Sequence, residues 1–79
     1  MISMALSTKL KQYRMEVDVV QDDFALAVGI RGATFSAIER GKRCSYTTAK
    51  KILDVLNMYR GNRSLPPIGY VEELGLTIV

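Results

Sequence analysis

The chain has 79 residues, of which 48% are hydrophobic and 24% are charged, and its net charge is +3. This length allows one small domain, whose core contributes only about 3–5 kcal/mol, so the fold must be locally well specified or supported by a second chain. One cysteine and no histidine exclude an intrachain disulfide, a cluster of soft metal ligands and histidine-based catalysis. No apolar stretch approaches the roughly 18 residues of a membrane span. We therefore expect a small cytoplasmic binding domain without cofactor, metal or catalytic residues.

The net charge is unevenly distributed along the chain. Residues 31–51 hold six lysines and arginines against the single Glu39, a net charge of +5, whereas residues 1–30 and 52–79 each carry −1. A basic segment between acidic flanks indicates a polyanionic partner, although a solvated helical face produces the same pattern. Charge alone leaves both interpretations open.

The first two predicted helices follow from apolar spacing and from stop signals. Apolar residues at helical intervals predict a helix over 3–15, and Asp18 is its expected stop because Asp tolerates a left-handed backbone. A short helix is predicted over 21–28, with two acidic residues in its first turn and Gly29 directly after its end.

Two further helices are predicted in the centre of the chain. One runs over 32–40 and is ended by Gly41, and the other runs over 47–57 with N-cap hydroxyls in front of it. Residues 42–45 form an exposed loop between them. Together the four segments predict an all-α fold.

The tail after the fourth predicted helix has a different composition. Residues 60–64 are expected to form a turn or linker, residues 70–74 one helical turn, and residues 76–79 have the composition of a strand. We therefore divide the chain into a domain over 1–58 and a tail over 59–79. The tail is expected either to pack back on the bundle or to bind a second chain or another protein.

Residues 21–40 carry the functional pattern of helix, glycine-centred turn and helix. Ala25 stands where two steeply crossing helices approach most closely, so a small side chain is needed there, and Gly29 stands at the turn. The apolar residues Phe24 and Phe35 occupy inner positions of the two helices. This pattern predicts a helix-turn-helix.

The flanks of this stretch carry a family resemblance. Gln21, Ala25 and Gly29 are followed by the run Ile38-Glu39-Arg40-Gly41-Lys42-Arg43. With these motifs, residues 6–58 resemble the Cro/CI-type helix-turn-helix family, also called XRE or lambda-repressor-like. The resemblance implies a bundle of four to five helices that binds double-stranded DNA, usually as a homodimer on a two-fold symmetric operator.

The resemblance also implies roles for individual residues. Gln21 is expected to contact a backbone phosphate at the start of the second helix, and Arg14 and Glu39 to form an internal ion pair. Phosphate contacts are expected from the loop after the recognition helix, at Arg40, Lys42 and Arg43. Base contacts are expected from the start and exposed face of the third helix, at Arg31, Gly32, Ala33, Thr34, Ser36 and Ala37.

Direct base contacts are expected to be few. Gly32, Ala33 and Ala37 stand where family members often carry Gln, Asn or Ser, and none of them can form a bidentate hydrogen bond to a base. Arg31 is the strongest candidate because its guanidinium can bind O6 and N7 of guanine. Three explanations stay open: a short contacted core assisted by DNA shape, DNA binding of modest specificity, or a third helix used for protein contact.

Two further positions depart from expectation. Val20 stands where the family usually has an N-cap residue, at a cost of about 1 kcal/mol that the following acidic residues partly offset. Cys44 lies in the basic loop and is expected to be a tolerated surface cysteine, with redox sensing as the alternative.

The favoured hypothesis is a small sequence-specific DNA-binding transcriptional regulator, a repressor of phage, plasmid or mobile-element type that acts as a dimer on a palindromic operator. The alternative is a protein-interaction module on the same fold, such as the antitoxin of a toxin–antitoxin pair or an antirepressor. Such a module would bind its partner through the third helix or the tail. We expect no enzymatic activity, because no catalytic constellation is present in the sequence.

Overall fold

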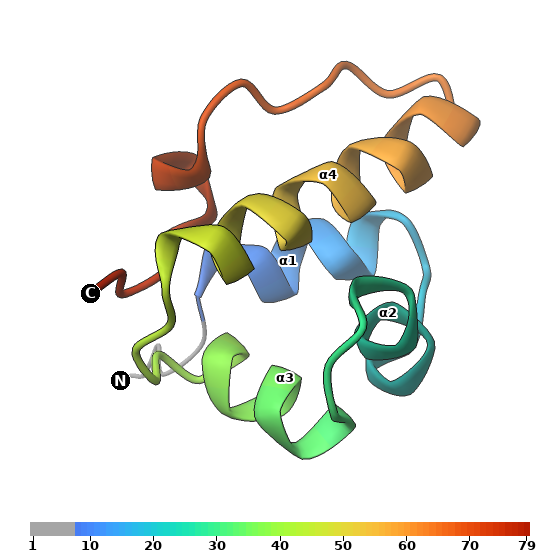
Figure 1. The fold of residues 1–79 in the computed structure, drawn as a ribbon. Helices are drawn as coiled ribbons and strands as arrows, with labels where there is room; N and C mark the ends of the chain where they lie inside the picture. Colours follow the sequence, from blue (N-terminus) through green and yellow to red (C-terminus); the bar gives the residue numbers. More distant parts are fainter. Residues whose placement is uncertain (1–7) are drawn as a thin grey trace, which may run out of the picture.

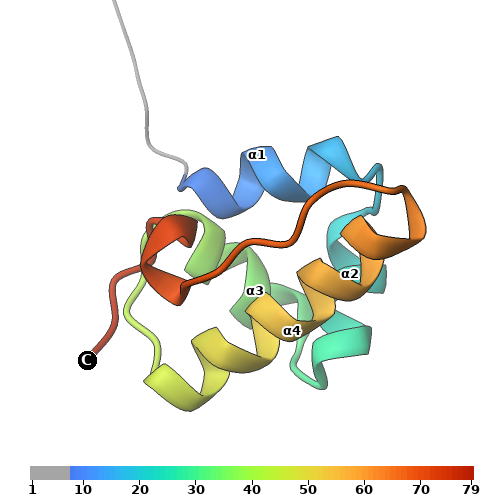
Figure 2. The same cartoon turned by 90° about the horizontal axis from the view of Figure 1, so that it is seen from above.

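The computed structural model describes residues 8–79 as a bundle of four helices and one short 3-10 turn. The elements are α1 (Lys9–Glu16), α2 (Gln21–Val28), α3 (Gly32–Glu39), α4 (Tyr46–Asn62) and the turn η1 (Val71–Leu74). Figures 1 and 2 show α2 beside both α3 and α4, while the chain after α4 runs back along the bundle to η1. The predicted all-α fold is confirmed.

The end of α1 and both bounds of α2 and α3 agree closely with the local signals. Helix α2 has the predicted bounds. Asp18 follows the end of α1 with a left-handed φ of 57°, as expected for a residue that stops a helix. Gly29 has φ 91° after α2, a backbone conformation that residues with a side chain rarely adopt. The part of the first predicted helix over residues 3–7 lies outside the described residues, and α1 begins at Lys9.

Helix α4 is longer than predicted and continues to Asn62. The expectation of a turn from residue 60 onward is therefore wrong for residues 60–62. Tyr59 packs against the core and the Arg60 side chain is buried, so tertiary contacts override the poor helix propensity of Gly61 and Asn62. At the other end, the Ser45 hydroxyl accepts a hydrogen bond of 3.1 Å from the amide of Thr48, as the predicted N-cap requires.

The core is built on two stacked rings that join α2 to α3. The rings of Phe24 and Phe35 lie 4.9 Å apart between centroids, and both side chains are fully buried. Ile68, Val71 and Leu74 of the tail belong to the same buried cluster. The tail thus packs back on the bundle, which is one of the two arrangements expected.

Two polar side chains of α4 hold the tail in place. The Asn57 amide group donates to the carbonyl of Ile68 at 2.9 Å and accepts from the Ile68 amide at 2.8 Å. Arg60 donates to the Pro66 carbonyl at 2.8 Å and forms a 2.8 Å ion pair with Glu16 of α1. These bonds satisfy the extended backbone of the tail, which has no helical hydrogen bonds of its own there.

The end of the tail pairs with the loop that follows α3. The Cys44 amide donates to the Thr77 carbonyl at 2.9 Å, and the Val79 amide donates to the Cys44 carbonyl at 3.0 Å. This pairing buries Cys44, so the expectation of an exposed surface cysteine is wrong. Burial raises the pKa of the Cys44 thiol, whereas redox sensing needs a thiol of lowered pKa.

Candidate nucleic-acid interface

The turn between α2 and α3 fixes the crossing of the two helices. The amides of Gly29 and Ile30 both donate to the Ala25 carbonyl, at 2.9 and 3.0 Å. The Ala25 side chain is buried at this crossing, as its small size predicts. The outer face of α3 is left facing solvent.

A buried carboxylate joins the ends of three helices behind this face. Glu39 at the end of α3 is 1% exposed and forms an ion pair with Arg14 of α1, at 2.6 Å between Nε and Oε2. Its other oxygen accepts from Gln21 of α2 at 2.7 Å. A buried charge is tolerated when it is paired and fully hydrogen-bonded, and this network therefore sets the position of α3 in the bundle. The predicted Arg14–Glu39 pair is confirmed.

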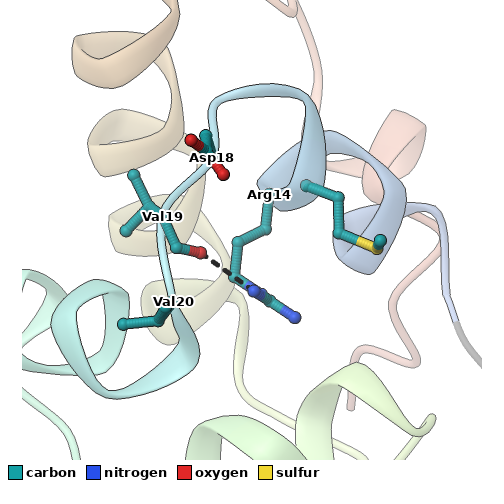
Figure 3. A pocket seen from close by; sticks show the side chains of 5 residues that line it. Arg14, Asp18, Val19 and Val20 are labelled. Carbon is teal, nitrogen blue, oxygen red and sulfur yellow. Dashed lines mark hydrogen bonds between the residues drawn. The ribbon is translucent and has the colours of Figure 1, made fainter.

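The same arginine also ties down the loop between α1 and α2. Its Nη1 donates to the Val19 carbonyl at 2.9 Å, as Figure 3 shows. Beside this bond lies an open cavity of about 150 Å³, lined by Arg14, Met15, Asp18, Val19 and Val20. The bond orients the entry of the chain into α2.

Gln21 lies at the start of α2, but its side chain faces inward. The side-chain amide donates to Glu39 and the residue is half-buried, so the side chain has a structural partner in addition to its expected phosphate contact. Among the described residues, no side chain caps this helix N-terminus, where Val20 occupies the cap position. The first backbone amides of α2 thus stay open to an anion.

The first turn of α3 brings together four of the predicted base-contacting residues. Arg31 occupies the N-cap position and is exposed, as are Ala33 and Thr34. Gly32 is half-buried because the Asp22 side chain of α2 covers it. In the sequence, Asp22 is recognisable mainly as one of two acidic residues in the first turn of the predicted helix over 21–28, and nothing there indicates its contact with Gly32.

The second turn of α3 and the loop after it hold the remaining predicted residues. Ser36 and Ala37 are half-buried, and the Ser36 hydroxyl accepts a 2.7 Å hydrogen bond from Arg40. Lys42 and Arg43 are exposed, and the Lys42 amide donates to the Ala37 carbonyl at 3.0 Å. The loop therefore starts as a direct extension of α3, with its cations beside the helix end.

The cations around α3 have no acidic partner among the described residues. Within residues 8–79, the ion pairs are Arg14–Glu39, Lys50–Asp54 and Arg60–Glu16. None of them uses Arg31, Arg40, Lys42 or Arg43. These four charges are therefore available to a phosphate backbone, and they lie at both ends of one exposed helix.

Within residues 8–79, no group of three or more His, Cys, Asp or Glu residues is placed to hold a metal ion. In that stretch no helix combines the length and the apolar character that crossing a membrane requires.

The comparison with protein families agrees with this geometry. A family model described as Helix-turn-helix, of the XRE or Cro/CI type, matches residues 10–60, from the second residue of α1 to Arg60 in α4. The chain therefore belongs to the XRE-type helix-turn-helix family and is a DNA-binding transcription regulator by class. No curated protein and no solved structure matches the chain significantly.

Proposed function

We propose that the chain is a sequence-specific repressor of phage, plasmid or mobile-element type, acting as a dimer on a palindromic operator. The observation that carries this proposal is the exposed face of α3. Its position is held by the buried Glu39, and it is flanked by four cations that form no ion pair among the described residues. A rigid helix with free charges at both ends suits the major groove, whose phosphates lie on either side.

Each part of this face has a distinct task in the proposed complex. Arg31 donates to the O6 and N7 atoms of guanine, and Thr34 donates to a base or a phosphate. The methyl groups of Ala33 and Ala37 contact thymine methyls. Lys42 and Arg43 bind phosphates and supply affinity that does not depend on sequence. The protein represses by occupying the promoter.

The proposed dimer uses the tail. Residues 59–79 carry exposed apolar side chains at Tyr70 and Val79, which are 70% and 72% exposed. A two-fold contact through this surface buries both and gives two α3 helices a defined separation. Sedimentation equilibrium tests this step. Tyr70→Glu should shift the average molar mass from that of a dimer toward that of a monomer, while the helical circular dichroism of the chain stays unchanged.

Selection of bound duplexes from a random pool, at two salt concentrations, tests DNA recognition directly. An enriched palindrome whose affinity falls steeply with salt supports the proposal. Lys42→Ala serves as a control, because it should weaken all retained duplexes alike without changing the enriched sequence. Failure of the full-length chain to retain any genomic duplex at low salt contradicts the proposal.

A second candidate function is supported by the small side chains on α3. Gly32, Ala33 and Ala37 have no side chain or only a methyl group, and Leu26 on α2 is 79% exposed. Such a surface suits contact with a protein, as in an antitoxin or an antirepressor. Affinity capture from the native host at high salt distinguishes the two: a stoichiometric protein partner favours this candidate, since DNA contacts weaken with salt.

A further inference from the structure

We infer that Asp22 of α2, whose side chain lies against the start of α3, contacts a DNA base. The contact selects cytosine, because Asp22 accepts a hydrogen bond from the exocyclic N4 amino group of that base. This inference rests on the proposed DNA function and names a specificity residue for it. The residue takes the place of the side chain that Gly32 does not have.

The packing of Asp22 against Gly32 is the geometric basis. A Cβ atom added to Gly32 would lie 2.5 Å from Oδ1 of Asp22 and 3.6 Å from its Cγ. The carboxylate thus occupies the space into which a side chain at the first position of α3 would extend. Figure 1 shows α2 and α3 adjacent around the short turn that joins them.

The exposure of Asp22 leaves this carboxylate accessible to a ligand. The residue is exposed, and the ion pairs formed within residues 8–79 do not include it. Ala33, which follows Gly32 on α3, is small and exposed. A base edge that meets the start of α3 therefore meets both Arg31 and Asp22.

The chemistry of a carboxylate selects which base it can meet. An ionised carboxylate only accepts hydrogen bonds, and phosphate oxygens also only accept, so Asp22 is repelled by the DNA backbone. In the major groove, amino donors are N4 of cytosine and N6 of adenine. Adenine carries the acceptor N7 beside its amino group, which repels the second carboxylate oxygen, whereas cytosine carries no acceptor on its exposed edge. Cytosine is therefore the preferred base.

Arg31 and Asp22 form a complementary pair at the start of the recognition helix. Arg31 offers donors that suit guanine, and Asp22 offers acceptors that suit cytosine. Together they supply polar base contacts that the glycine and alanines of α3 lack. Specificity at the start of α3 then comes from α2 and from the N-cap rather than from the exposed face of α3.

A competing explanation assigns Asp22 only to the dipole of α2. Two acidic residues occupy the first turn of that helix, Asp22 and Asp23, and either one complements the positive helix end. Asp23 is exposed as well but does not approach Gly32 in the structure. Asp23→Ala is consequently the matched control for Asp22→Ala, because both remove one first-turn carboxylate.

The experiment measures the affinity of the 79-residue chain for the selected duplex. It also measures the affinity for three altered duplexes, in which each of the other three bases replaces cytosine at the position that Asp22 contacts. The unmodified chain should prefer cytosine by about fivefold or more. Asp22→Ala should bring the four affinities within about twofold of one another at that position in both half-sites. Asp23→Ala should keep the cytosine preference.

A second variant displaces the carboxylate without removing it. Gly32→Ala places a Cβ against Oδ1, and because this atom is the end of a flexible side chain, it can move aside. Since alanine is the better helix former, the variant should melt at an equal or higher temperature while losing the cytosine preference. Loss of specificity without loss of stability separates base contact from a structural role.

The outcomes distinguish this inference from the proposed function. If Asp22→Ala and Asp23→Ala raise the affinity for all four duplexes equally, Asp22 acts as a repulsive charge and the inference is overturned. If an enriched operator shows no cytosine preference that depends on Asp22, the inference fails while DNA recognition stands. If the unmodified chain enriches no duplex, the proposed function itself fails.

Discussion

The charged and polar side chains around α3 and those beneath the tail have different partners. Lys42 and Arg43 are exposed and form no ion pair within residues 8–79. Asn57 and Arg60 donate hydrogen bonds to the tail backbone, and Arg60 also pairs with Glu16 of α1. Helix α3 is anchored from behind through Glu39, so its outer residues are not needed for the fold. The tail has no repetitive backbone hydrogen bonds of its own before η1, so polar side chains must hold it. The charged side chains that have no partner within the described fold are the ones available to bind a ligand.

Removal of the tail should cause the largest loss of folding stability. A chain ending at Ser64 loses the buried side chains of Ile68, Val71 and Leu74, each worth roughly 1.5–3 kcal/mol. The summed loss is comparable to or larger than the stability expected of so small a domain, about 3–5 kcal/mol, so the shortened chain should be largely unfolded at room temperature. The helical circular dichroism signal, followed during heating, measures this loss of stability.

A chain ending at Leu76 is the matched control for this truncation. It keeps η1 and lacks the backbone pairing with Cys44, so it should still melt cooperatively. A cooperative transition of the Ser64 chain at the temperature of the full chain would show that the tail is dispensable for the fold.

Substitution of Glu39, which anchors α3, should cause the next largest loss of stability. Glu39→Ala leaves Arg14 with a largely buried charge and without its ion-pair partner, at a cost of about 3–5 kcal/mol. Urea denaturation measures the change. Asp54→Ala is the control, because the Lys50–Asp54 pair is exposed and contributes at most about 0.5 kcal/mol. Similar midpoints for the two variants would contradict the anchoring role of Glu39.

Substitutions on the outer face should affect DNA binding and leave folding unchanged. Arg31→Ala should lower discrimination between operator and altered duplexes by about 1–3 kcal/mol, whereas Lys42→Ala should reduce the salt slope by about one for every duplex. Both are exposed and outside the ion pairs of residues 8–79, so their melting temperatures should match the unmodified chain. Gel shifts at several salt concentrations measure both effects. Equal loss of discrimination in the two variants would remove the distinction between base and phosphate contacts.

The smallest expected effect concerns the thiol of Cys44. Its pKa is raised by burial, so the folded state favours the protonated form, and the stability that this contributes is lost as the pH rises through the folded pKa. The thiol should therefore react slowly with iodoacetamide in the full chain at neutral pH, and faster in urea. A reaction rate in the folded chain equal to that in urea would show that the tail does not protect it.

Local signals predicted the helix-turn-helix well because they act over a few residues. The bounds of α2, the left-handed stop at Asp18 and the turn at Gly29 each depend on the backbone preferences of one or two residues. The Arg14–Glu39 pair was predicted from the family resemblance, since the two residues are 25 positions apart and no local pattern links them.

The sequence alone did not predict the contacts between α4 and the tail. Gly61 and Asn62 after Arg60 predict a turn there, and the partners of Arg60, Glu16 and Pro66, have no recognisable spacing in the sequence. The charged residues around Cys44 predict a surface position for it. In both cases, the partner that decides the burial is far away in the chain or in an extended segment without periodicity.

The sequence by itself determined the all-α class, the order of the helices, the family and the concentration of positive charge around the third helix. These follow from apolar periodicity, glycine positions and charge counts, which are short-range properties of the chain. The tertiary structure decided the burial of Cys44, the true length of α4, the path of the tail and the placement of Asp22 against Gly32. These depend on contacts between distant segments, whose energy outweighs local propensity once the core has formed.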